Sequence, residues 1–171
     1  VRCLCRSEPV GDIAHPQLEV VQSGEARGLL LGGTLTQLTA SLGTPFAFDP
    51  PDGGVLFLDE VGELPFRIDR MLTQLRLSGV LARVAAVVFG ELPRCDEPGG
   101  EPTARATVAR VLADFRGPVL FGLPSGHTTG ATLTLPFGVA VTVVADAQPR
   151  LVVEEAAVLV HLMEAFDLGA Q

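Results

Sequence analysis

The sequence predicts an α/β domain built around a sheet with parallel strand pairs. Three short apolar runs, at residues 55–58, 84–89 and 118–121, are uninterrupted, as in strands that are buried on both faces. Two segments with helical periodicity, residues 65–78 and 104–115, separate these runs. Strands that alternate with helices along the chain form parallel pairs, and this alternation indicates the fold class.

Composition favours one soluble globular domain. The chain has 171 residues, of which 47% are hydrophobic and 19% charged, which suits a single substantial core. Its net charge of -8 and its scattered arginines argue against nucleic acid as a partner, because phosphate binding needs clustered basic residues. The apolar runs are too short to span a bilayer, so no membrane partner is expected.

The cysteines indicate a reducing compartment and no metal site. Cys3, Cys5 and Cys95 are odd in number, and the close pair could only form a very tight disulfide. A zinc site would need a fourth ligand and a second paired motif. No signal peptide is visible, and a start at Val1 suggests that the chain begins inside a longer polypeptide.

Before the first strand we expect a linker or lead-in segment over residues 1–23, with the domain itself over residues 24–171. A short apolar run leads into a helix that begins after Thr34. Thr34 can cap that helix, Gln37 has the spacing of a capping box, and Gly43 suits its end.

The middle of the chain gives the clearest elements. A buried strand over residues 55–58 is followed by a helix over residues 65–78 that begins at a proline and ends before Gly79. Its inward face is formed by Ile68, Met71, Leu72 and Leu75. A strand at 84–89, a helix at 104–115 and a strand at 118–121 follow.

The last third predicts shorter strands, over residues 132–135, 139–146 and 150–155, with a turn at 146–149 between the last two. Residues 156–168 have the pattern of a final helix. Its inward residues would be Leu159, Leu162, Met163 and Phe166.

Polar side chains gather where two of the predicted parallel strands end. Asp59 and Glu60 follow the strand at 55–58, and His127 lies in the loop GLPSGH after the strand at 118–121. Functional groups collect beyond the carboxyl ends of parallel strands, so an acid and this histidine could form a pair in which the carboxylate orients the imidazole.

Plainer interpretations exist for the same residues. A lone loop histidine is more often solvated or structurally bonded, and acids around a turn are usually a solvated rim. Ser125 is two residues from His127 and lacks the strand-to-helix elbow of a nucleophilic serine, which predicts a turn residue.

Five longer strings change that balance. GGTLTQL, LGTPF, VLFLDEVGELPFRIDRMLTQL, GLPSGH and LTLPFG, in this order, resemble the C-terminal domain of the LD-carboxypeptidase family, across roughly residues 24–155. The resemblance implies a swivelling β/β/α-type domain, with a central mostly parallel sheet and a second small sheet. It also implies that His127 is the general base of a serine-type triad.

For the complete enzyme the resemblance implies hydrolysis of the L,D peptide bond to the terminal D-alanine of murein tetrapeptide, in cytoplasmic peptidoglycan recycling. No metal or organic cofactor is needed, and a homodimer is suggested. The family's serine lies in a separate N-terminal domain in a G-x-S-D-like turn, and no such string occurs in this chain. The chain alone is therefore expected to be inactive, with that domain as its partner.

The triad acid has two candidates. Family members usually read Glu-Asp after this strand, whereas here Asp59 precedes Glu60. Position favours Asp59 and side-chain chemistry favours Glu60. Neighbouring strand residues point to opposite faces, so only one can face His127 well, and we favour Asp59 because the buried strand sets the register.

Three functions stay open at this stage. The chain is the C-terminal part of a muropeptide carboxypeptidase, or it belongs to the branch resembling microcin-immunity carboxypeptidases, which act on an aminoacyl- or peptidyl-nucleotide. The third is a non-catalytic binding module that has lost the serine domain. The parent reading frame upstream of Val1 would separate the third from the others.

Overall fold

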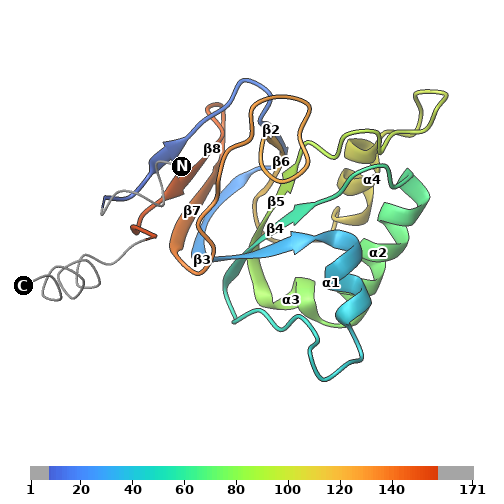
Figure 1. Cartoon of the computed structure of the whole chain (residues 1–171), viewed down its shortest axis with the longest axis horizontal. Helices are drawn as coiled ribbons and strands as arrows, with labels where there is room; N and C mark the ends of the chain where they lie inside the picture. The colour runs from blue at the N-terminus through green and yellow to red at the C-terminus, as the bar shows by residue number, and fades with distance from the viewer. Residues whose placement is uncertain (1–7, 158–171) are drawn as a thin grey trace, which may run out of the picture.

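The protein is arranged in three layers. A computed structural model describes residues 8–157. A small sheet lies on one side, a mostly parallel sheet in the middle and the helices on the other side (Figure 1). The small sheet therefore covers one face of the central sheet, and the helices cover the other. The β/β/α expectation is confirmed.

The core of the central sheet is parallel, as the alternating pattern predicts. Its strands are β3 (Gly24–Thr34), β4 (Gly54–Asp59), β5 (Val84–Gly90) and β6 (Val119–Leu123). The pairs β3–β4, β4–β5 and β5–β6 are all parallel. All six residues of β4 are buried, which explains its uninterrupted apolar run.

Strand β3 belongs to both sheets. Its first half, residues 24–29, pairs antiparallel with β7 (Ala140–Ala145), and its second half, residues 30–34, pairs with β4. Strands β8 (Arg150–Val153) and β1 (Gly11–Ile13) complete the small sheet. Two glycines of β3 allow the close approach to β4. A Cβ on Gly28 would lie 2.0 Å from the Gly53 carbonyl oxygen, and one on Gly32 would lie 1.9 Å from that of Phe57.

The described part of the expected linker carries two edge strands. β1 pairs with β8, and β2 (Glu19–Gln22) pairs antiparallel with β6, so the two strands lie at opposite ends of the eight-stranded order. Residues 11–13 and 19–22 thus belong to the sheets. Elements of three and four residues are too short to show periodicity.

The helical layer contains α1 (Leu35–Ser41), α2 (Pro65–Leu77), α3 (Val80–Arg83) and α4 (Ala104–Val111). The core beneath it includes Leu56, Leu58, Ile68, Leu72 and Val108. A second core lies between the central sheet and the small sheet and includes Leu30, Val55, Phe57, Val141 and Leu151. Alternate residues of β4 thus face opposite layers, which matters for the two acids that follow.

Two expectations for local structure are wrong. Residues 132–135 form no strand, because the backbone of Leu133 bonds instead to the loop before it: its N–H donates to the Pro124 carbonyl at 2.7 Å. Thr34 is the N-cap residue of α1, but its side chain makes no capping hydrogen bond. The helix expected at 156–168 falls almost wholly outside the described residues.

Within 8–157, no helix has the length and apolar character needed to cross a membrane.

Candidate active site

Strand ends gather the candidate residues at one edge of the central sheet. Thr34 lies beside Asp59 in the β3–β4 register, and Leu123 lies beside Gly90 in the β5–β6 register. The loops after β4, β5 and β6 therefore start at a common edge. That is the region where α/β sheets place functional groups.

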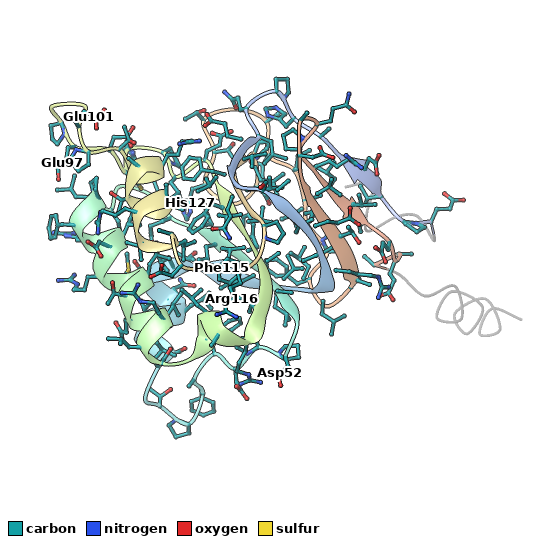
Figure 2. The ribbon with its side chains drawn as sticks, turned by 180° about the vertical axis from the view of Figure 1, so that it is seen from behind. Asp52, Glu97, Glu101, Phe115, Arg116 and His127 are labelled. Carbon is teal, nitrogen blue, oxygen red and sulfur yellow. The ribbon has the colours of Figure 1, made fainter. Side chains whose placement is uncertain are left out.

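Asp59 and His127 are in direct contact there, although 68 residues separate them. The imidazole Nδ1 lies 2.6 Å from Oδ2 of Asp59, and the backbone N–H of His127 donates to the same oxygen at 3.0 Å. Figure 2 shows His127 over the central sheet, between the helical layer and the small sheet. One carboxylate oxygen thus holds both the ring and the backbone of this residue.

The contact with Asp59 favours one tautomer of the His127 ring. An ionised carboxylate can only accept hydrogen bonds, so a neutral ring beside it donates from Nδ1 and keeps the lone pair on Nε2. The His127 side chain is 47% exposed, whereas that of Asp59 is 5% exposed. Within residues 8–157, Nε2 forms no hydrogen bond. The pair thus combines a buried carboxylate with a half-exposed imidazole, an arrangement that could serve general-base chemistry.

Two glycines shape the space around the Asp59 carboxylate. Gly126 has φ +75°, and a Cβ on it would lie 2.3 Å from Oδ2. A Cβ on Gly90 would lie 3.0 Å from Oδ1. Oδ1 is buried and has no hydrogen-bond partner within the described chain. The carboxylate therefore depends on the His127 donors for its stabilisation, since a buried charge without partners is costly.

Glu60 points to the opposite face of the sheet, where it binds the first turn of α1. Its Oε2 accepts hydrogen bonds from the backbone N–H and the hydroxyl of Thr36, at 2.8 and 2.6 Å. Thr36 lies in the first turn of α1, whose free N–H groups favour a negative charge. Glu60 thus supplies the cap that Thr34 was expected to supply, and it does not contact His127.

Ser125 is a loop residue, as expected. It is buried, and its hydroxyl donates to the Leu133 carbonyl at 2.9 Å. Glu63, the third acid of the loop after β4, pairs with Arg67 on the first turn of α2. Within residues 8–157, neither Ser125 nor Glu63 forms a hydrogen bond with the His127 ring.

The sequence arguments missed Glu91. This residue follows β5 directly, and its Oε2 accepts hydrogen bonds from both the N–H and the hydroxyl of Thr129, at 2.8 and 3.0 Å. Thr129 lies two residues beyond His127. The rule that singled out Asp59 and His127, that polar groups collect where parallel strands end, applies equally to Glu91.

A shallow pocket of about 360 Å³ lies beside the acid. Its lining includes Gly33, Thr34, Phe57, Asp59, Gly126 and Phe137. A larger hollow of about 460 Å³ lies at the other end of the sheet, around Phe115 and Arg116 (Figure 2), and contains none of the candidate residues. No group of three or more metal-binding side chains occurs among residues 8–157.

Comparison with known proteins identifies the family. Residues 27–143 match the model of the LD-carboxypeptidase C-terminal domain. The chain belongs to this family. A putative carboxypeptidase of Streptomyces coelicolor is 46% identical over 127 residues, which cover 72% of this chain and 38% of that protein. The chain thus spans well under half the length of this relative, and the family is one of serine-type carboxypeptidases.

Solved structures of related proteins share the fold. The muramoyltetrapeptide carboxypeptidase of Oxalobacter formigenes superimposes with a TM-score of 0.73 at 28% identity, covering 87% of this chain and 50% of that one. The microcin C7 self-immunity protein in complex with glutamyl sulfamoyl guanosine gives a TM-score of 0.71 at 27% identity. This superposition covers 81% of this chain and 41% of the self-immunity protein.

Proposed function

We propose that this chain supplies the acid and the base of a serine-type LD-carboxypeptidase that releases the terminal D-alanine from murein tetrapeptide. The observation that carries the proposal is the 2.6 Å contact between Asp59 Oδ2 and His127 Nδ1, in a histidine whose side chain is half-exposed. The serine and its oxyanion hole come from an N-terminal domain of the enzyme.

In this mechanism Nε2 of His127 takes the proton from the serine hydroxyl as its oxygen attacks the carbonyl of the L,D peptide bond. The imidazolium then returns that proton to the departing amine of D-alanine, which leaves an acyl-enzyme. A water molecule, deprotonated by the same nitrogen, then attacks the ester carbonyl, and the imidazolium returns that proton to the serine oxygen as the ester bond breaks. Asp59 holds the ring in place and stabilises its cation in both steps.

The surroundings of Asp59 support this role. Its carboxylate is buried, so the dielectric around the ion pair is low and the imidazolium gains more from it than it would in water. The pocket beside it, about 360 Å³, adjoins the site where the substrate would lie. Cytoplasmic muropeptides are the proposed substrate pool.

A second candidate is cleavage of an aminoacyl- or peptidyl-nucleotide. The likeness to the microcin C7 self-immunity protein, solved with a sulfamoyl nucleoside, favours it. The same acid and base would serve, because the bond cleaved is again an acyl bond. Turnover of murein tetrapeptide against that of a peptidyl-nucleotide separates the two substrates.

The test uses the protein expressed from its complete reading frame. Release of D-alanine from murein tetrapeptide is measured for His127→Ala, Asp59→Asn and Glu60→Gln. We expect the first two to lower kcat by about 10³- to 10⁴-fold. Glu60→Gln is the matched control, a buried carboxyl one position away, and should retain most activity. Equal, mild losses in Asp59→Asn and Glu60→Gln would contradict the assignment, and no turnover by the wild type would favour a non-catalytic module.

A further inference from the structure

The loop that carries His127 is closed at its base. The Ser125 hydroxyl donates to the Leu133 carbonyl at 2.9 Å, and the Leu133 N–H donates to the Pro124 carbonyl at 2.7 Å. These two bonds fix the points where the loop leaves and rejoins the body of the protein. They do not by themselves determine where the residues between them lie.

Residues 126–130, the tip of this loop, are attached to the rest of the molecule at two acids. Within the described residues, the tip's hydrogen bonds to other parts of the chain go only to Asp59 and Glu91. The remaining bonds are internal, between the Thr128 hydroxyl and the backbone of Gly130. Such internal bonds shape the turn but do not place it over the sheet.

The two attachments hold two nearby residues of the tip, His127 itself and Thr129. Asp59 holds the N–H and the ring of His127, and Glu91 holds the N–H and hydroxyl of Thr129 two residues later. The two acids stand at the ends of the neighbouring parallel strands β4 and β5. A loop pinned by two adjacent strand ends cannot pivot about a single anchor. Both bonds to Glu91 go to one charged oxygen, which strengthens them relative to neutral acceptors.

We propose that Glu91 is a positioning residue for catalysis, which keeps His127 in register with Asp59 by anchoring Thr129. The proposal rests on the function proposed above, in which His127 is the base. The reasoning is geometric: loss of the second anchor lets the tip rotate about the Asp59 contact. Displacement of a catalytic group by about 1 Å can cost two orders of magnitude in rate.

A plain surface hydrogen bond is the competing explanation, because Thr129 is exposed and exposed polar pairs often contribute little. A second competing explanation is that Glu91 acts through its negative charge rather than by anchoring Thr129, since Glu91 and Asp59 are the acids that bond to this loop. The amide variant separates these effects. Gln keeps an acceptor oxygen for both Thr129 donors and removes the charge, whereas Ala removes both.

The first measurement is amide hydrogen exchange by NMR on the 171-residue chain, comparing Glu91→Ala, Glu91→Gln and the control Glu97→Ala. Glu97 lies further along the loop after β5 that begins at Glu91, and it is well away from His127 (Figure 2). We expect Glu91→Ala to raise exchange at Thr129 about tenfold, with no change across the β4 and β5 amides. Glu91→Gln should stay within about threefold of the wild type, and Glu97→Ala should match it. Unchanged exchange at Thr129 in Glu91→Ala would overturn the proposal.

The second measurement is steady-state kinetics on the protein from the complete reading frame. Glu91→Ala should lower kcat about 10- to 100-fold with little change in KM, and Glu91→Gln should restore most of the loss. A kcat equal to the wild type in Glu91→Ala, or a Gln variant as impaired as Ala, would refute the positioning role. The hydrogen-exchange measurement tests only whether Glu91 anchors the loop, and it does not depend on catalysis. If His127→Ala retained activity, the proposed function would be refuted, but the finding that Glu91 anchors Thr129 would stand.

Discussion

Replacing Gly126 by alanine tests how tightly the acid and the histidine are held together. Gly126 has φ +75°, a conformation that costs an L-residue with a Cβ about 1–2 kcal/mol. The new methyl would also lie 2.3 Å from Oδ2 of Asp59, far inside contact distance. That oxygen accepts both hydrogen bonds from His127 and cannot move without lengthening them.

The size of the effect follows from those two costs. A hydrogen bond to a charged group contributes about 1.5–3 kcal/mol, and because the His127 side chain is half-exposed, water replaces part of what is lost. We therefore count about one such bond. Added to the backbone cost, this gives a decrease of about 2.5–5 kcal/mol in the free energy of unfolding.

Two other glycines separate the contributions. Gly43 has φ +80°, and a methyl group added there would have nothing within 4 Å, so Gly43→Ala should show the backbone cost alone, about 1–2 kcal/mol. Gly130 lies in the same loop as Gly126 and also has open space around it. Gly130→Ala should change stability by less than about 0.5 kcal/mol.

The assay is urea unfolding followed by far-UV circular dichroism, since the chain contains no Trp or Tyr to report by fluorescence. In the protein from the complete reading frame, Gly126→Ala should also lower kcat, whereas Gly43→Ala should not. A Gly126→Ala variant that loses no more stability than Gly43→Ala would refute the reasoning, because the carboxylate would then have room to accommodate the methyl.

Two further predictions concern acids outside the pair. Glu60→Gln should lower the free energy of unfolding by about 1 kcal/mol and increase amide exchange at Thr36, because it weakens a charged cap of α1; unchanged exchange would contradict the capping role. The hydrogen bond from Arg110 lowers the pKa of Asp69, so this carboxylate stabilises the fold above its unfolded pKa and loses that contribution as the pH falls through its folded value. Arg110→Ala should therefore lower the free energy of unfolding by less than about 1 kcal/mol at pH 7. In urea unfolding experiments this difference from the wild type should shrink towards pH 3. A difference that does not depend on pH would exclude the Arg110–Asp69 pair as its cause.

The parallel core could be predicted from the sequence because its strands are buried on both faces. Such strands show uninterrupted apolar runs, and β4, β5 and β6 lie where those runs lie. The edge strands β1 and β2 could not be predicted in this way. Each has three or four residues, and their place is set by free edges of β8 and β6 that are distant in sequence.

The sequence by itself determined the order of the core parallel strands and of the helices between them, the two loops that carry polar groups and the family resemblance, since each depends on local pattern. Only the tertiary structure decided which acid meets His127. Asp59 and Glu60 are adjacent, and the pleat of β4 sends them to opposite layers, one towards the histidine loop and the other towards α1. Glu91 likewise acquires its contact with Thr129 only when β5 and β6 pair, because 38 residues separate the two along the chain.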